Sequence, residues 1–354
     1  MPIVLNGITI SGGVTFSPGP LAFTAPTLMG GSSSLSYMYG VTVSSSGLFV
    51  AVGSSYTTSA SRYSTSSNGI TWTTPAAMNG SASVFNMTAV TVNSSGLFVA
   101  VGYELTGQPV YATSANGSTW TTPARMNGSS AAGRMLGVTV NSSGLFVAVG
   151  YDSINAGVYA TSSDGSTWTT PARMNGSSTA AQMAAVTVSS SGRFVSVGYN
   201  ASTQPMYSTS TDGSTWTTPA TMGGSNSMYG VAVNSSGLFV AVGYRSSDNA
   251  AVYATSSNGS TWTTPALMAG SATIAFMYGI AVNSAGLFVA VGYTGSSLIP
   301  VYATSTDGST WTAPTAMSET IVPVYTRAVT VNSSGLFVAV GDRPVGGAEA
   351  AYSV

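Results

Sequence analysis

The chain has 354 residues, of which only 5% are charged, against roughly 25% in an ordinary soluble domain. Its 8 basic residues are all arginine, and with the 9 acidic residues they leave a net charge of −1. Histidine, cysteine and lysine are absent, which excludes disulfides, Schiff bases, His- or Cys-ligated metals and Ser-His-Asp triads. So neutral a chain cannot bind a nucleic-acid backbone by counterion release, and no pattern in it predicts a cofactor.

Residues 1–20 precede the repeated part of the chain. They lack the basic start and long apolar run of a secretory signal, and no apolar run approaches the ~20 residues that cross a bilayer, so we expect no membrane insertion. The opening MPIVLNGITISGGVTF resembles the short N-terminal segments of tailed-phage virion proteins, including fibre and decoration proteins. The resemblance implies a virion location and an arm that docks on other virion subunits. The alternative is an extra strand folded on the side of the following domain.

Residues 21–354 are built from one repeated unit. The segment GLFVAVG recurs along the chain, and its phenylalanines Phe98, Phe146 and Phe194 are 48 residues apart. A tyrosine in segments such as VYAT and a tryptophan in TWTTP recur in the same order. Self-similarity at a period of this size is typical of propellers and solenoids.

Four short antiparallel strands are expected in each unit. In the third unit they are residues 137–140, 145–149, 158–161 and 166–170, the last ended by Pro171. The second is apolar throughout, as in a strand covered on both faces. Asp164 and Gly165 suit a two-residue hairpin turn, in which both central residues have positive φ. The pattern of four strands per unit predicts an all-β, seven-bladed β-propeller.

The two ends of the repeat indicate a closed ring. The chain stops after the seventh repeat tyrosine, one strand short of a full unit, while residues 23–29 match residues 311–317. An N-terminal strand that completes the C-terminal blade closes a propeller, whereas an open solenoid needs polar caps instead. In this arrangement Phe23 takes the place of a seventh tryptophan.

The turn TSSDGSTW, residues 161–168, resembles the Asp-box of sialidase-like propellers, although Ser163 stands at the Asp place of the box. In that family the box is a structural turn, so the resemblance implies the fold and no activity. Sialidases resemble one another in an arginine triad, a tyrosine–glutamate pair and an acidic proton donor. Here Arg125 and Arg173 occupy equivalent repeat positions, the glutamates Glu104, Glu319 and Glu349 all fall in loops, and there is no Arg-Ile-Pro-type motif. We therefore expect that the chain is not an enzyme, although loop acids that converge in space could still form a paired-carboxylate glycosidase.

Strand order places two kinds of loop on opposite faces. The first-to-second and third-to-fourth turns barely change between units, while the other connections differ in nearly every unit and gather charge and aromatics. Such variation suits binding loops on a rigid scaffold. Around the channel mouth the first strands offer Tyr39, Thr88, Leu136, Ala184, Tyr229, Tyr278 and Arg327. The predicted ligand-binding residues are Phe85, Arg134, Tyr151, Asp152, Tyr199, Tyr244, Arg245, Asp248, Phe276, Tyr293 and Arg327.

The function that these features favour is that of a structural and binding protein of a phage virion, in a fibre, spike or decoration. Its variable face would contact a host-surface glycan, a host protein or a neighbouring subunit, because aromatic and polar side chains on a shallow surface suit stacking and hydrogen bonding. The alternatives are a secreted bacterial lectin, which would be extracellular, and a sialidase-like glycan hydrolase.

Overall fold

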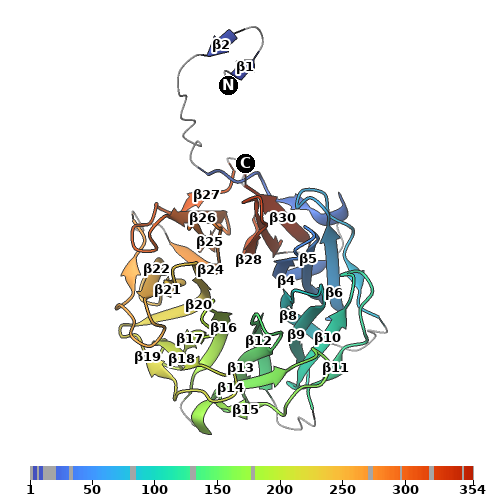
Figure 1. Ribbon diagram of the computed structural model, residues 1–354, viewed down its shortest axis with the longest axis vertical. Helices are drawn as coiled ribbons and strands as arrows, with labels where there is room; N and C mark the ends of the chain where they lie inside the picture. The colour runs from blue at the N-terminus through green and yellow to red at the C-terminus, as the bar shows by residue number, and fades with distance from the viewer. Residues whose placement is uncertain are drawn as a thin grey trace.

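The computed structural model describes residues 3–5, 8–10, 21–31, 35–79, 85–127, 133–176, 180–269, 274–295, 297–318, 323–344 and 347–353. Within these ranges, seven four-stranded antiparallel sheets stand around a central axis like the blades of a propeller (Figure 1). The prediction of a seven-bladed β-propeller is therefore confirmed. We number the blades 1 to 7 from the sheet that contains β4 to the sheet that contains β28.

The first strand of each blade is innermost and lines the channel. The first strands are β4 (Ser36–Val43), β8 (Phe85–Val92), β12 (Gly133–Val140), β16 (Gln182–Val188), β20 (Asn226–Val233), β24 (Ala275–Val282) and β28 (Tyr325–Val331). The second strands carry the GLFVAVG motif. They are β5 (Phe49–Ser55), β9 (Phe98–Glu104), β13 (Phe146–Asp152), β17 (Phe194–Tyr199), β21 (Phe239–Arg245), β25 (Phe288–Thr294) and β29 (Phe337–Asp342).

The third strands carry the repeat tyrosine. They are β6 (Ser61–Ser66), β10 (Pro109–Ser114), β14 (Gly157–Ser162), β18 (Pro205–Ser210), β22 (Ala250–Ser256), β26 (Pro300–Ser305) and β30 (Ala348–Tyr352). The fourth strands form the outer edge. They are β7 (Ala76–Ala77), β11 (Ala124–Arg125), β15 (Ala172–Arg173), β19 (Ala220–Thr221), β23 (Ala266–Leu267), β27 (Thr315–Ala316) and β3 (Thr27–Leu28). Short 3₁₀ turns, η1 (Met29–Gly31) and η2 (Met174–Gly176), follow β3 and β15.

The hydrophobic core lies between neighbouring blades. Val147 and Val149 of blade 3 pack with Met183, Phe194 and Trp216 of blade 4 in one buried cluster, and similar clusters occur around the ring. The second strands are apolar and buried because they have a blade on each side. Methionine fills the irregular gaps, as its flexible side chain allows.

The hairpin between the third and fourth strands differs from the predicted turn. Gly165 has a φ of 76°, but Asp164 keeps a negative φ, so the predicted pair of positive φ values is wrong. Side chains hold this turn instead. Asp164 Oδ1 accepts the N–H groups of Ser166 and Thr167 at 2.8 and 2.6 Å, and Ser162 Oγ accepts the N–H of Gly165 at 2.9 Å. Aspartate and serine often hold turns in this way, because their short side chains accept hydrogen bonds from backbone N–H groups a few residues further along the chain.

The outer strand also lies later in the chain than predicted. In blade 3 its ladder consists of Ala172 and Arg173, paired with Tyr159 and Val158, rather than residues 166–170. Around Thr169 the chain makes one backbone bond to Thr161, and Pro171 then has no N–H to offer. The ladder therefore resumes only after the proline.

The ring is closed as the sequence predicts. Blade 7 has the order β28-β29-β30-β3, in which Thr27 pairs with Ala350 and Leu28 with Glu349. The N–H of Thr24 donates to the carbonyl of Tyr352 at 3.0 Å. The two ends of the propeller thus share one blade.

Residues 1–20 are described only at β1 (Ile3–Leu5) and β2 (Ile8–Ile10). These two strands pair with each other in a two-stranded antiparallel sheet. The remainder of the predicted arm lies outside the described residues, and the division of the chain at residue 20 stays a prediction.

Candidate functional site

A β-bulge in each first strand builds the mouth of the channel. In blade 3 the pairing with β13 shifts register between Met135 and Gly137, so Leu136 is the extra residue. A bulge redirects the side chain of the extra residue, and here it turns that side chain toward the axis. The seven extra residues line one cavity of about 280 Å³, and they are Tyr39, Thr88, Leu136, Ala184, Tyr229, Tyr278 and Arg327.

The last glycine of the GLFVAVG motif is required by this bulge. A Cβ atom on Gly150 would lie 1.8 Å from the carbonyl oxygen of Arg134, which is closer than any real contact. Gly102 and Gly292 face the carbonyls of Asn86 and Phe276 at the same distance. The motif therefore sets the position of the bulge and, with it, the side chains at the channel mouth.

Blades 5 and 6 each place a stacked pair of tyrosines beside the mouth. The rings of Tyr229 and Tyr244 are 5.4 Å apart with a 10° interplanar angle, and their hydroxyls are 3.2 Å apart. Tyr278 and Tyr293 repeat this geometry. Their ring centres are 5.3 Å apart, and the hydroxyl of Tyr293 donates a hydrogen bond of 3.1 Å to the hydroxyl of Tyr278. A contact of 4.8 Å between Tyr229 and Tyr278 joins the two pairs.

Further rings extend these pairs on both sides. The ring of Tyr199 lies 5.2 Å from that of Tyr229, and the ring of Tyr325 lies 5.0 Å from that of Tyr293. Phe276 contacts Tyr244 edge-on at 4.7 Å. We call the set the aromatic arc, and its members are Tyr199, Tyr229, Tyr244, Phe276, Tyr278, Tyr293 and Tyr325.

Burial keeps four phenols of the arc in the neutral form. Burial raises the pKa of Tyr199, Tyr229, Tyr278 and Tyr293 above the ordinary value for tyrosine. At neutral pH these hydroxyls therefore keep their protons. The arc offers ring faces together with groups that both donate and accept.

Blade 7 carries an ion pair at the positions of the stacked tyrosines. Arg327 Nε donates to Asp342 Oδ1 at 3.2 Å, and the side chain of Asp342 is only 1% exposed. The guanidinium carbon lies 5.0 Å from the ring centre of Tyr325 and 5.8 Å from that of Tyr39. Burial raises the pKa of Asp342 to about 6, although Arg327 opposes the rise, and burial also raises the pKa of Tyr39 to about 12.

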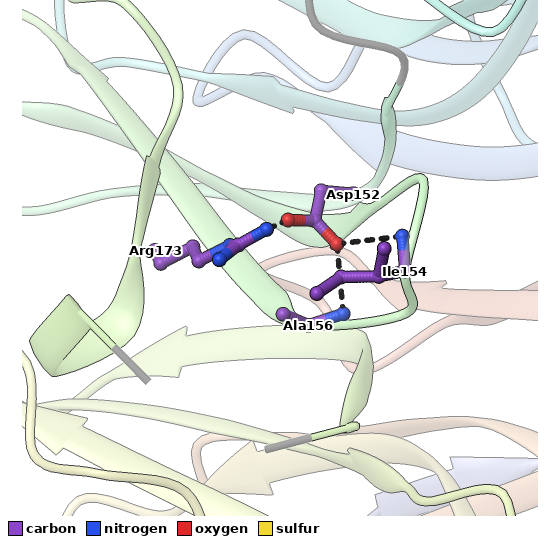
Figure 2. Close-up of polar contacts among 4 residues, drawn as sticks. All are labelled: Asp152, Ile154, Ala156 and Arg173. Atoms are coloured by element: carbon purple, nitrogen blue, oxygen red, sulfur yellow. Dashed lines mark hydrogen bonds and ion pairs between the residues drawn. The ribbon is translucent and has the colours of Figure 1, made fainter. Parts of the chain in front are cut away.

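A second cavity of about 300 Å³ opens where blades 2 and 3 meet. Arg134, Tyr151 and Asp152 line it, and the guanidinium of Arg134 lies 4.5 Å from the ring centre of Tyr103. Figure 2 shows that both oxygens of Asp152 are already engaged. Oδ1 accepts the N–H groups of Ile154 and Ala156 at 3.0 and 2.9 Å, and Oδ2 accepts Arg173 Nε at 2.6 Å. Asp152 therefore organises its own loop.

Other predicted site residues have local roles. Phe85 is 9% exposed and packs in the core between blades 1 and 2, and its assignment as a ligand-binding residue stays a prediction. Arg245 and Asp248 form an ion pair with each other across one loop, at 2.5 and 2.9 Å. The predicted residues that the structure brings together are Tyr199, Tyr244, Phe276, Tyr293 and Arg327 at or beside the mouth, and Arg134, Tyr151 and Asp152 at the second cavity.

Tyr103 and Tyr325 were missed among the predicted ligand-binding residues. Tyr103 follows GLFVAVG as Tyr151 does, so the repeat itself could have identified it. Tyr325 pairs in register with Asp342, as Phe276 pairs with Tyr293, and only alignment of the first strands shows this equivalence.

No protein-family model matches the chain, and no curated protein matches its sequence. Solved structures do match. The BP39L lectin from Burkholderia pseudomallei has a TM-score of 0.69 and 11% identity, over 90% of this chain and 96% of the lectin. YCF48 bound to D1 peptide has a TM-score of 0.62 and 13% identity, over 92% of this chain and 94% of that one. A catalytically inactive virginiamycin B lyase from Staphylococcus aureus, with quinupristin, has a TM-score of 0.66 and 10% identity, over 94% of this chain and 99% of the lyase.

These similarities define the class of the chain as a β-propeller and correct one expectation. The prediction that the chain is not an enzyme is wrong, because it excluded a class of protein that includes enzymes of the same fold, such as virginiamycin B lyase. At such low identity the likeness shows the fold alone and assigns no reaction to this chain. Across the described ranges, no helix is long and apolar enough to span a membrane.

Proposed function

We propose that the chain is a glycan-binding propeller whose aromatic arc and channel mouth contact a host-surface glycan. The arc carries the proposal, because it is a continuous run of ring contacts beside a cavity of about 280 Å³. Sugar rings stack their C–H faces on aromatic rings, while their hydroxyls need both donors and acceptors. The neutral phenols of Tyr229 and Tyr278 supply these beside the rings. The propeller fold of a bacterial lectin is similar, which supports this reading.

Binding to a glycan array, followed by calorimetry with the best ligand, tests the proposal. Tyr278→Ala should weaken binding about tenfold or more, since truncation of an anchoring aromatic costs about 2 kcal/mol. Ile70→Ala is the matched control, because Ile70 is exposed on the opposite face in the turn between β6 and β7. Thermal melting must first show that both variants are folded. Equal affinity of Tyr278→Ala and the unaltered chain would refute the site.

We further propose that the propeller is displayed on a virion and held there by residues 1–20. The support is the resemblance of the N-terminal segment to virion proteins and the separate pairing of β1 with β2. Purified particles should contain the protein. Deletion of residues 1–20 should abolish its incorporation while the propeller keeps its melting temperature. Unchanged incorporation would remove the arm from the proposal.

A protein partner is the second candidate, and exposed apolar loop tips favour it. Leu105 is 63% exposed and Ile154 is 51% exposed, both on loops of the variable face. YCF48 is a propeller of similar fold that has been seen bound to a peptide. Leu105→Ser combined with Ile154→Ser should weaken capture by the host surface if a protein is bound, while Tyr278→Ala should matter more if a glycan is bound.

A further inference from the structure

Most arginines in the described part of the chain are neutralised by a carboxylate. Five of them form ion pairs with Glu104, Asp152, Asp248, Asp342 and Glu349, and these are Arg125, Arg173, Arg245, Arg327 and Arg343. At the channel mouth the charge of Arg327 is therefore balanced by Asp342. Among the described residues, only Arg62, Arg134 and Arg193 have no carboxylate within ion-pair distance.

Arg134 is the one member of this group that is exposed on the variable face beside a cavity. The Nε of Arg62 is buried without a partner. Arg193 lies on the opposite face, in the turn region before β17, and its Nη1 donates to Ser260 Oγ at 3.3 Å. Arg134 is therefore the unpaired cation that a ligand on the variable face could reach.

Among the seven blades, blade 3 alone has a charged residue, Arg134, at this position of its first strand. Arg134 pairs with Tyr151 across the β12–β13 ladder. The residues equivalent to Arg134 in the other blades are neutral, and they are Tyr37, Asn86, Gln182, Ser227, Phe276 and Tyr325. Its guanidinium carbon lies over the ring of Tyr103 from blade 2, at 4.5 Å from the centre. A cation held against a ring face is positioned before any ligand arrives.

The cavity beside Arg134 has a positive balance of charge. Its walls come from Gly107 of blade 2 and from Arg134, Tyr151, Asp152 and Asn155 of blade 3. The carboxylate of Asp152 is bound by Arg173 and by two backbone N–H groups. Two arginines and one aspartate leave one net positive charge, and that charge is on the guanidinium that borders the open space.

We propose that this cavity is a subsite for an anionic substituent of the glycan, a carboxylate or a sulfate ester. The substituent accepts hydrogen bonds from the guanidinium of Arg134, while Tyr151 packs against the sugar ring that carries it. Guanidinium groups bind planar and tetrahedral oxyanions through two parallel N–H donors, which is why arginine suits this role. The inference rests on the proposed function in one respect, namely that a glycan carries the anion.

The test compares three matched oligosaccharides, one neutral, one carboxylated and one sulfated, by calorimetry. The unaltered chain should bind one of the two acidic forms at least about tenfold more tightly than the neutral form, as expected for a charge-assisted hydrogen bond. Arg134→Gln should remove this preference and leave affinity for the neutral form unchanged. Arg134→Lys should keep part of it, and the control Arg193→Gln should keep all of it. The two acidic forms distinguish a carboxylate subsite from a sulfate subsite.

Two results would overturn the inference: an unaltered chain with no preference for either acidic form, or a preference that survives in Arg134→Gln. If the chain binds none of the oligosaccharides, the proposed glycan function fails, and the subsite is judged by inorganic sulfate alone. A sulfate-dependent rise in melting temperature that is lost in Arg134→Gln and kept in Arg193→Gln supports the subsite. An equal response in all three proteins overturns it.

Discussion

The ring of Phe23 lies 5.1 Å from the ring of Tyr302, and the hydroxyl of Tyr302 donates to the carbonyl of Leu21 at 2.8 Å. In blades 1 to 5 the third-strand tyrosine meets the tryptophan of the next blade, as Tyr253 meets Trp311 at 6.0 Å. Phe23 therefore replaces a seventh tryptophan, and the N-terminal strand seals the gap between blades 6 and 7.

Phe23→Ala should lower the free energy of unfolding by about 3–5 kcal/mol, because it removes a buried aromatic side chain that is only 5% exposed. Urea unfolding followed by tryptophan fluorescence measures this change. Deletion of residues 1–20, which leaves Phe23 in place, is the control and should keep the midpoint. A midpoint for Phe23→Ala within error of the unaltered chain would show that the closing strand contributes no stability.

Trp168→Ala should cost about 3–5 kcal/mol, because Trp168 is 2% exposed and its ring lies 6.1 Å from that of Tyr111 in the preceding blade. Its Nε1 also donates to the carbonyl of Gly165 at 2.9 Å. Trp168→Phe keeps a ring but loses this bond, so a smaller loss is expected. Chemical denaturation measures both, and equal losses in the two variants would contradict the packing role.

Gly150→Ala should destabilise the protein more than Gly144→Ala. At Gly150 a Cβ atom would lie 1.8 Å from a backbone oxygen, so the bulge itself would have to move. At Gly144 a Cβ has open space, and the cost is only that of a left-handed φ of 89°, about 1–2 kcal/mol. Thermal melting ranks the two, and the reverse order would mean that the bulge tolerates a side chain.

Asp342 should make stability depend on pH between about 4 and 6. Its pKa rises from 3.8 to about 6 on folding, so the folded state binds more protons than the unfolded state in this window. The free energy of unfolding therefore falls as pH rises through it, by about 3 kcal/mol for a shift of this size. Asp342→Asn cannot titrate and should remove the fall.

Urea unfolding at half-unit pH steps measures this dependence. Glu349→Gln is the comparison, because burial raises the pKa of Glu349 as well and its removal should leave the Asp342 contribution in place. Backbone N–H groups lower the pKa values of Asp164 and Asp307, so the stability that these turns gain is lost only as pH falls below about 4. A slope that persists in Asp342→Asn would assign the window to another group.

The site was only partly accessible from the sequence. The channel-mouth residues could be named because each one precedes the start of a repeated strand, as Tyr229 and Tyr278 do. That the mouth and Tyr244, Phe276 and Tyr293 form one continuous arc could not be predicted, since ring contacts between blades depend on side-chain direction. Phe85 is predicted to bind a ligand because it ends a variable loop, but its side chain packs between the blades.

The sequence by itself determined the number of blades, their strand order and the closure by residues 23–29, because repeat spacing and turn residues are local and occur in every copy. Tertiary structure decided which side chains face a ligand. A bulge shifts the strand pairing by one residue and redirects the side chain of the extra residue. This shift directs the side chains of Tyr39 and Arg327 to the channel mouth. The tertiary structure also decided which charged side chains are neutralised by an ion pair. Arg173 reaches Asp152 from another strand, while no carboxylate in the described ranges reaches Arg134.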